Sequence, residues 1–591
     1  GIRDIGVTGV QTCALPICQV PELDYLTMDY LAEVSMSILA LQRDRNPQTG
    51  YPQDFVEVVR GLAPYWGSGG RCKLIANAGG LNPAACARAC QAVLEQAGCR
   101  SMKIGIVTGD DVLGILKMNE SLELFDNLDT RIKLRDVVGR LVTANAYMGC
   151  RGIVQALEMG ADLVITGRVA DPSMVAAACA FHFGWSLEDW DRMAAATVAG
   201  HLLECGTHVT GGILTDWMSI PDPTHLGFPI AEVDQDGGLV ITKSSLTGGC
   251  VTEATVKEQL LYEISNPDCY ISPDVEVSFL GLKVQQEGRD RVAVRGAIGR
   301  PRPKTIKVSA TYRDGYRAAG TLTLVGEHAV EKGYRCGQIV LDRLRDAGWH
   351  YTQTVVECLG NGESVPVMRS LNEGHDSYET VLRIAVESSD KDAVEAFSKE
   401  MIPLVTAGPQ GTTGYAQGRP SVQPVFRYWP CLIDEKVVPW SVDLIETASP
   451  SPSAAKHSWP KYHVNNREKR GGESSERGNS TKPALQAPKP RRLKSIAYGR
   501  SGDKGIHANI GILVRDPADY AWLCKWLTSE RVHDFFRPMG LERVERFEAP
   551  NLCGINFLLY GVLNCSIRND AQGKALAQAL LTISIPDERE V

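Results

Sequence analysis

Acidic and basic side chains directly follow two apolar runs that are typical of buried strands. In "SMKIGIVTGDDV" the run ends before Asp110 and Asp111, and in "DLVITGRVADPS" it ends before Arg168 and Asp171. Carboxylates can hold a hydroxyl group or transfer a proton, and an arginine beside a helix N-terminus can bind an anion. The second stretch also predicts a helix that starts at Pro172 with Asp171 as its cap, and capping with a local salt bridge would explain both stretches equally well.

Two glycine-rich turns form a second type of candidate site. "IANAGGLNP" predicts a strand over 73–76, a turn with Asn77, Gly79 and Gly80, and a helix over 83–96 capped by Asn82. "SSLTGGCVTEA" places Gly248 and Gly249 before a helix capped by Thr252. Such turns let a phosphate or carboxylate approach the backbone, but tight left-handed turns without a ligand have the same sequence pattern.

The stretch "HLLECGTH" contains His201, Glu204, Cys205 and His208. His201 and Cys205 are four residues apart, but Gly206 is expected to end the helix, so His208 leaves their face. Since no second cluster of ligands is visible, the sequence favours a core role over a metal site. We therefore expect no metal, and we consider Glu204 a candidate acid or base.

Three further stretches contribute polar groups. "TANAYMGC" offers Asn145 and Tyr147, and a tyrosine can donate a proton or contact an oxyanion. "GPQGTTGYAQGRP" ends in Arg419, which can grip a carboxylate or phosphate. "YGRSGDKGIHANIG" is interpreted as an anion-binding loop between two strands or as an internally paired turn; its polar residues are Arg500, Ser501, Asp503 and Lys504.

These residues must be positioned by two folded units. From Tyr25 to about Gly227, short apolar runs alternate with helical stretches, which predicts an α/β unit with a parallel, helix-covered sheet. Loops after the strands of such a sheet are where ligands bind. From Tyr270 to Leu444 the apolar and polar residues alternate, which predicts an α+β extension of antiparallel strands with a hairpin turn at 312–315.

The second unit follows a change in composition. Residues 447–492 are rich in Ser, Pro, Gly, Lys and Arg, and we interpret them as a disordered basic linker. Residues 493–591 alternate strands and helices, with one amphipathic helix expected in "ADYAWLCKWLTSERVHDFF". This pattern predicts a small ferredoxin-like α+β domain. The first unit is placed at 18–446.

Residues 1–17 are interpreted separately. Codons chosen for Gly1 to Ile17 reproduce a short-read sequencing adapter with its index at Ile5 and Gly6. The basic start and continuous apolar run of a signal peptide are both missing. We therefore expect residues 1–17 to be an adapter artefact and the native sequence to begin at or just after Cys18.

Composition narrows the class of function. The 591 residues are 44% hydrophobic and 22% charged with a net charge of −8, which argues against a nucleic-acid-binding protein. No apolar run is long enough to span a membrane. The 17 cysteines are scattered, as expected of reduced thiols in a cytoplasmic protein. We expect a small-molecule substrate, and the sequence leaves a homo-oligomer open.

Several of these stretches, in this order, resemble the acyclic terpene utilisation (AtuA-like) family. "DYLTMDYLAEVSMSILA", "IANAGGLNP", "ANAYMGCRGI", "GADLVITGRVADPS" and "HLLECGTHVTGG" are similar to its large domain. "GRSGDKG" and "NLCGINFLLYGVL" are similar to its small ferredoxin-fold domain. The resemblance covers about 24–444 and 493–581. It implies a role in the degradation of acyclic isoprenoids such as citronellol and geraniol, whose intermediates are carried as coenzyme A (CoA) thioesters.

Two functional hypotheses follow from the residues and the resemblance together. The first is an enzyme of the lyase or hydratase type that acts on a branched acyl-CoA or a related carboxylate. Its catalytic residues would come from Asp110, Asp111, Glu204 and Tyr147. The other candidate residues would bind the substrate, with Arg168 and Arg419 holding its anionic groups. The second is a non-catalytic acyl-CoA-binding or assembly protein. No cofactor is identified beyond CoA as a substrate carrier.

Overall fold

The computed structural model describes residues 20, 22–32, 35–371, 377–414, 418–448 and 491–586. The expectations for residues 1–17 and for nearly all of the linker lie outside these described residues. Thr447 still belongs to the first unit, because its backbone N–H donates to the Met102 carbonyl and its Oγ1 accepts from the Met102 N–H, both at 3.0 Å.

The centre of the first unit is a five-stranded sheet in the order β1-β2-β5-β3-β18. Neighbouring pairs among the first four strands are parallel, and β18 is antiparallel to β3 at the edge. The strands are β1 (Tyr25–Met28), β2 (Lys73–Ala76), β5 (Leu163–Thr166), β3 (Lys103–Thr108) and β18 (Ser441–Glu446). The bounds of β2 and β5 confirm the two strands predicted there.

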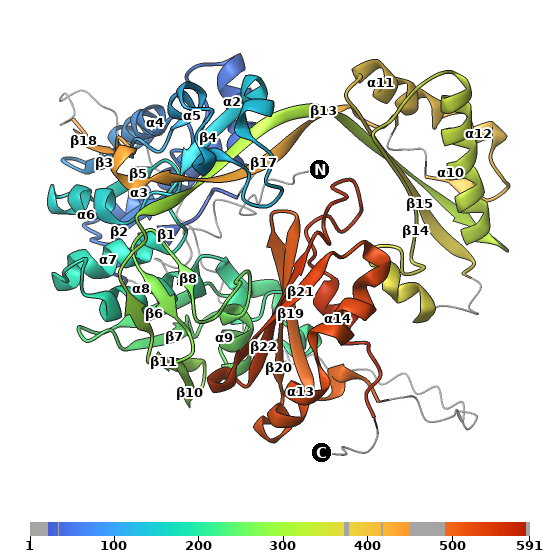
Figure 1. Cartoon of the computed structure of the whole chain (residues 1–591). Helices are drawn as coiled ribbons and strands as arrows, with labels where there is room; N and C mark the ends of the chain where they lie inside the picture. The colour runs from blue at the N-terminus through green and yellow to red at the C-terminus, as the bar shows by residue number, and fades with distance from the viewer. Residues whose placement is uncertain are drawn as a thin grey trace, which may run out of the picture.

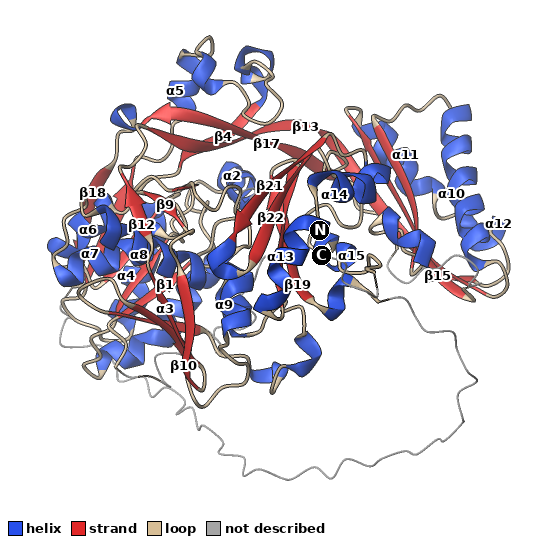
Figure 2. Cartoon of the chain, turned by 60° about the horizontal axis from the view of Figure 1, so that its bottom comes forward, coloured by secondary structure: helices blue, strands red, loops and turns tan. Residues whose placement is uncertain are grey.

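Helices pack on both faces of this sheet because its strands are apolar on both sides. Leu74 and Ala76 of β2 belong to the core of one face, whereas Ile75 between them belongs to the core of the other face. The first core includes α3 (Gln53–Gly67) and α4 (Pro83–Gln96). The second core includes α6 (Arg151–Glu158), α7 (Ser173–Phe183) and α8 (Trp190–Leu203). Figure 2 shows these helices around the strands.

Smaller elements complete this part of the chain. Two antiparallel sheets follow α8, with the orders β10-β11-β7-β6 and β12-β9-β8. Their strands are β6 (Pro229–Val233), β7 (Leu239–Lys243), β8 (Tyr270–Ile271), β9 (Glu276–Ser278), β10 (Lys283–Gly288), β11 (Arg291–Arg295) and β12 (Ile298–Arg300). The remaining helices here are α2 (Ser35–Arg45), α5 (Leu113–Met118) and α9 (Glu253–Leu260), and α9 is capped by Thr252 as predicted.

A single strand of 21 residues, β13 (Thr305–Val325), joins the body to a second lobe. Its first half pairs with β4 (Leu141–Ala146), and its second half pairs with β15 (Glu379–Ser388), while β17 (Gln423–Asp434) runs along much of it. The hairpin turn predicted at 312–315 is wrong. The chain continues through a register shift between Arg313 and Tyr316, so the turn-like residues form an irregularity inside one strand.

The second lobe is built on the far half of β13 (Figure 1). Its core joins that half of the strand to the helices that cover it. Its further elements are β14 (Gln353–Leu359), β16 (Thr412–Thr413), α10 (Ala329–Asp346), α11 (Lys391–Glu400) and α12 (Leu404–Ala407).

The C-terminal unit is a four-stranded antiparallel sheet in the order β19-β20-β22-β21. Its strands are β19 (Ala497–Lys504), β20 (His507–Val514), β21 (Arg543–Ala549) and β22 (Gly554–Tyr560), and its helices are α13 (Tyr520–Trp526), α14 (Ser529–Phe536) and α15 (Leu576–Leu580). The single amphipathic helix predicted here is two helices: α13 ends at Trp526 with Leu527 as its C-cap, and Thr528 then caps α14. Figure 1 shows this unit between the body and the second lobe.

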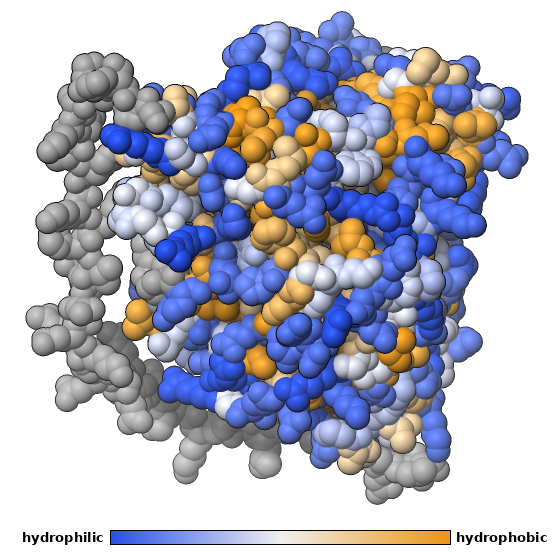
Figure 3. Space-filling view, turned by 90° about the vertical axis from the view of Figure 1, so that its left-hand side faces the viewer, coloured by the Kyte–Doolittle hydropathy of each residue, from blue (hydrophilic) through white to orange (hydrophobic). Residues whose placement is uncertain are grey.

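Within the described residues, no helix is long and apolar enough to cross a membrane. The side of the molecule shown in Figure 3 is predominantly hydrophilic, with its hydrophobic side chains in separate small groups. The fifteen described cysteines are free thiols.

Candidate functional site

A large cavity lies where the body, the second lobe and the C-terminal unit meet. Its volume is about 3070 Å³, several times the ~300–1,000 Å³ of a typical small-molecule site. Its walls come from the segment after β1, the end of α8, the segment after α9, the strands β13 and β17, and β19. Segments far apart in the sequence therefore contribute to one site.

One wall carries three carboxylates and one arginine: Asp29, Asp171, Glu204 and Arg168. Arg168 Nη2 lies 2.9 Å from Asp171 Oδ1, and its Nη1 donates to the Leu31 carbonyl. Its guanidinium also lies 4.1 Å from the centre of the Tyr147 ring. Arg168 therefore links the segment after β1 to the loop after β5 and leaves Asp171 in the cavity wall.

Glu204 is the most distinctive acid in this wall. Burial, followed by the charges of Asp29 and Glu263, raises the pKa of Glu204 well above its usual value. Its Oε2 has no hydrogen-bond partner, and its Oε1 lies 3.4 Å from His201 Nδ1. A carboxyl whose pKa is raised by burial holds its proton more tightly and can serve as a proton donor.

The neutral ring of His201 lies beside the Glu204 carboxyl. Burial lowers the pKa of His201 to about 4, so its ring is neutral near pH 7. Its Nε2 lies 2.9 Å from the Gln259 carbonyl oxygen, which can only accept, so Nε2 carries the ring proton. Nδ1 is then a free acceptor 3.4 Å from Glu204 Oε1, without a hydrogen bond to any described residue.

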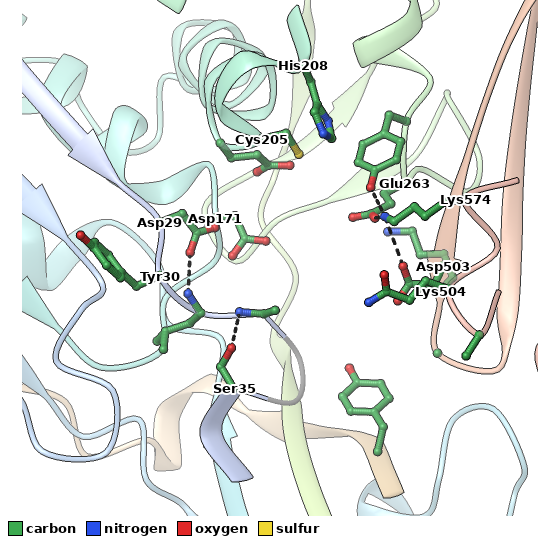
Figure 4. A pocket seen from close by; sticks show the side chains of 18 of the residues that line it. Asp29, Tyr30, Ser35, Asp171, Cys205, His208, Glu263, Asp503, Lys504 and Lys574 are labelled. Atoms are coloured by element: carbon green, nitrogen blue, oxygen red, sulfur yellow. Dashed lines mark hydrogen bonds and ion pairs between the residues drawn. The ribbon is translucent and has the colours of Figure 1, made fainter. Parts of the chain in front are cut away.

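The opposite wall is cationic and comes largely from the C-terminal unit (Figure 4). Lys574 Nζ contacts the Tyr262 hydroxyl and lies 3.0 Å from Glu263 Oε1 and 3.5 Å from Asp503 Oδ1. Burial alone would lower the pKa of Lys574, but Glu263 and Asp503 outweigh burial and raise it. Lys574 is therefore a paired cation.

Lys504 differs from Lys574 because its ammonium makes no hydrogen bond or ion pair with any residue that the structure describes. It lines the same cavity, and its positive charge acts on the pKa of both Glu204 and Glu263. Lys504 thus offers an unpaired cation in the same space as a carboxyl whose pKa is raised.

Two other groups in the wall are electrically neutral. Burial raises the pKa of the Cys205 thiol well above its usual value, so it is not an activated thiolate. Burial lowers the pKa of His208 to about 3, and its ring packs edge-on against Tyr262 at 5.2 Å. Within the described ranges, no three His, Cys, Asp or Glu residues are grouped to hold a metal ion.

The structure brings together only part of the residues singled out in the sequence. The cavity wall contains Tyr147, Arg168, Asp171, Glu204, Arg500, Ser501, Asp503 and Lys504. It does not contain Asn77, Gly79, Gly80, Asn82, Asp110, Asp111, Asn145, Gly248, Gly249 or Arg419.

The turn after β2 supports the wall from behind. Asn77 donates to Asp29 Oδ1 at 2.5 Å and accepts from the Tyr30 N–H at 2.7 Å, so it orients the segment after β1. Asn82 caps α4 as predicted and also donates to two backbone carbonyls. A Cβ at Gly79 would lie 2.5 Å from the Thr166 carbonyl oxygen, so the backbone approaches the protein itself at this turn. Gly80 has a φ of +53°, which the tight turn requires.

Asp110 and Asn145 form a buried pair outside the cavity. Asp110 Oδ2 accepts from Asn145 Nδ2 at 2.7 Å and from the Arg168 N–H at 2.8 Å. Burial raises the Asp110 pKa to about 6, against the effect of these two hydrogen bonds. Asp111 is exposed, and its Oδ1 accepts from the Leu113 N–H. Asp110 therefore holds the loop that carries Arg168, whereas Asp111 bonds locally at the start of α5.

The predicted cap at Asp171 is wrong. Pro172 is the N-cap of α7 and makes no side-chain capping bond, because the Asp171 carboxylate pairs with Arg168 instead.

The Gly248–Gly249 turn and Arg419 lie away from the site. The Gly248 and Gly249 N–H groups donate to the His225 and Pro221 carbonyls, so they are not free for an anion. Arg419 is exposed and outside the cavity wall.

The predicted loop at 500–504 is wrong as well, because these residues are part of β19. Arg500 lies in a buried ion pair with Glu258 of α9 and donates to Gln259 Oε1 and the Gly212 carbonyl. Ser501 accepts from the Ala577 N–H and donates to the Gly573 carbonyl. Arg500 thus joins the C-terminal unit to the first unit, and Ser501 bonds within the C-terminal unit. Asp503 and Lys504, at the end of the strand, face the cavity (Figure 4).

Sequence reasoning missed Asp29, Tyr262, Glu263 and Lys574. Asp29 directly follows β1, so the rule that ligands gather at the carboxyl ends of parallel strands would have found it. Glu263 and Lys574 are 311 residues apart and meet only through docking of the C-terminal unit. No local signal in the sequence marks them.

The fold and the cavity define a class of protein: an α/β body and a ferredoxin-like unit that together enclose one polar site. The comparison with known families agrees with this class. The chain belongs to the acyclic terpene utilisation family AtuA, whose model matches residues 11–444, and the model of the AtuA ferredoxin-like domain matches residues 491–586. Membership implies involvement in acyclic terpene utilisation. No curated protein and no solved structure matches the chain significantly.

Proposed function

We propose that this protein is an enzyme of acyclic terpene degradation that adds water to, or removes water from, a branched acyl-CoA thioester or a related carboxylate. The observation that carries the proposal is the buried Glu204 carboxyl, with its pKa raised and its Oε2 unpartnered, in the same cavity as the unpaired ammonium of Lys504. A proton donor and a cation in one enclosed space suit a reaction in which negative charge develops on a thioester oxygen.

The reaction balances with one carboxyl and one water. Water adds to the β-carbon of an unsaturated thioester, and the electron pair of the double bond moves to the thioester oxygen, which Lys504 stabilises. The α-carbon then takes the proton of Glu204, and the proton released by the water returns to that carboxylate. The reverse sequence is elimination of water.

The rest of the wall suits a branched hydrocarbon chain. Apolar residues from several elements line the cavity alongside the acids: Leu31, Ile38, Leu203, Phe228 and Ile230. They would exclude water from the acyl chain and strengthen the electrostatic effect of Lys504.

The test uses the purified full chain with branched α,β-unsaturated acyl-CoA thioesters. Hydration is followed by loss of the conjugated thioester absorbance and by the mass gain of one water. We expect Glu204→Gln to lower kcat by about 10²- to 10⁴-fold and Lys504→Met by about 10²- to 10³-fold. The matched control is Glu57→Gln, which changes an exposed glutamate of α3.

Two outcomes would contradict the proposal. Full activity in Glu204→Gln would show that Glu204 is not the acid of the reaction. Tight binding of the thioesters by the wild-type chain without turnover would instead support the non-catalytic binding protein.

A further inference from the structure

A second group of charged residues lines the cavity in the second lobe, apart from the Glu204 wall. Arg317 of β13, Arg383 of β15 and Arg427 of β17 meet Arg568, which comes from the segment 564–570 of the C-terminal unit. We call these four residues the arginine recess. Three acids lie among them: Asp314, Glu357 and Glu387.

Two of the four arginines are fully paired. Arg383 contacts Glu357, and Arg427 contacts Glu387 and lies 3.0 Å from Asp314 Oδ2. Asp314 also contacts Arg140 outside the recess. The acids are therefore occupied by Arg383, Arg427 and Arg140.

Arg317 and Arg568 remain without an ionic partner. Neither guanidinium makes a hydrogen bond or ion pair with a residue in the described part of the chain, and Arg568 Nη1 is buried. Burial lowers the pKa of Arg317, and Arg427 and Arg383 lower it further, whereas Glu387 acts against them. Two half-buried cations thus face the cavity beside two paired ones.

The paired arginines hold Arg568 in place. Arg383 donates to the Ile567 carbonyl at 2.8 Å, and the Asn569 N–H donates to Glu357 Oε1 at 3.0 Å. Arg427 donates to Ser566 Oγ at 2.8 Å. The residues on both sides of Arg568 are anchored to the lobe, so its unpaired guanidinium is positioned in advance.

We propose that the arginine recess binds a phosphate group of the CoA carrier whose thioester reacts at Glu204. The two N–H groups of a guanidinium can bond to two oxygens of one phosphate, and a phosphate would give Arg317 and Arg568 the negatively charged partner that they lack. This inference rests on the proposed function for the identity of the carrier. The size of the cavity supports it, because the acid wall and the recess belong to one space of about 3070 Å³. A ligand that reaches from the arginine recess to the acid wall must be long, with an anionic group at the recess and an apolar part at the other end.

Binding of CoA, dephospho-CoA and pantetheine to the full chain, measured by titration calorimetry, tests the recess. We expect Arg317→Gln and Arg568→Gln each to weaken CoA binding by about 10- to 100-fold, as for the loss of a charge-assisted hydrogen bond. Pantetheine, which lacks the nucleotide phosphates, should bind the wild type and both variants alike. Arg313→Gln is the matched control, because Arg313 is exposed on the same strand and outside the cavity wall.

The three ligands distinguish the phosphate groups. A larger loss for CoA than for dephospho-CoA assigns the recess to the 3′-phosphate, and equal losses assign it to the pyrophosphate. Circular dichroism verifies that the variants fold, and Arg568→Lys, which keeps the charge without the fork, should bind with intermediate affinity.

The experiments distinguish a wrong assignment of the arginine recess from a wrong proposed function. Wild-type affinity for CoA in both glutamine variants, or an equal loss for CoA and pantetheine, overturns the recess while leaving hydration intact. Recess-dependent CoA binding without turnover of any thioester supports the recess and overturns the proposed reaction.

Discussion

The Arg500–Glu258 ion pair fastens the C-terminal unit to α9, and its removal gives a pH-dependent prediction. The side chains are 2% and 0% exposed, with Arg500 Nε 3.4 Å from Glu258 Oε2. Burial raises the pKa of Glu258 to about 7, although Arg500 opposes the shift. We expect Arg500→Met to destabilise the protein at every pH and more strongly at high pH.

The sign follows from proton linkage. A carboxyl whose pKa is 4.5 unfolded and about 7 folded contributes stability that is fully present below pH 4.5 and lost as pH rises through 7. The loss over this window amounts to roughly 3.5 kcal/mol at about 1.4 kcal/mol per pH unit. Without Arg500 the pKa of Glu258 rises further, so the variant continues to lose stability above pH 7.

The size of the effect comes from the contacts of Arg500. Its Nη1 and Nη2 donate to Gln259 Oε1 and the Gly212 carbonyl, each at 3.1 Å. Two buried acceptors without partners cost about 1–3 kcal/mol each at any pH. The two acceptors together therefore give about 2–6 kcal/mol, and where Glu258 is ionised its unpaired buried carboxylate adds to this cost. We therefore expect the difference from wild type to grow by about 1.4 kcal/mol per pH unit above 7.

Urea unfolding followed by tryptophan fluorescence at pH 6 and pH 8.5 measures this difference. The double variant Arg500→Met/Glu258→Gln is the control, because it has no carboxyl at position 258, so its destabilisation relative to wild type should fall rather than grow between pH 6 and pH 8.5. A single variant whose destabilisation is the same at both pH values would refute the reasoning.

Three changes elsewhere have local effects. Asn82→Ala removes the cap of α4 and should lower the free energy of unfolding by about 1 kcal/mol, measured by urea titration. Gly114→Ala should raise it by up to about 1 kcal/mol, because the position is helical and a Cβ meets nothing within 4 Å. Gly167→Ala should instead destabilise strongly in the same titration, since its Cβ would lie 2.1 Å from Asp110 Oδ1. Equal stabilities for the two glycine variants would contradict this account of their surroundings.

Local patterns predicted the elements of the body well. The strand Lys73–Ala76 and the helix Pro83–Gln96 have the predicted bounds, because their signals are local: an apolar run, a glycine turn, an asparagine cap and a proline at the first helical position. The strand Leu163–Thr166 was found for the same reason. Such signals act within a few residues and do not depend on distant partners.

Predictions that depended on distant partners were less successful. Residues 312–315 have the composition of a turn, but pairing with β4, β15 and β17 keeps them in one long strand. The glycine-rich 500–504 segment pairs with β20 along its whole length for the same reason. Asn77 and Asp110 were predicted to bind substrate and to act as an acid or base, yet they bond to Asp29 and Arg168 and lie outside the cavity wall.

The site depends on both units because neither unit alone supplies both the acids and the cations of the cavity wall. The first unit supplies the buried acids Asp171 and Glu204, and the C-terminal unit supplies the unpaired cations Lys504 and Arg568. Burial is the largest cause of the raised pKa of Glu204, whereas Lys504 of the C-terminal unit acts to lower it. Docking of that unit through Arg500 would therefore complete the proposed anion contacts and place the cation of Lys504 in the same cavity as the proposed acid. This dependence explains physically why the ferredoxin-like domain belongs to the site rather than serving only as an attachment.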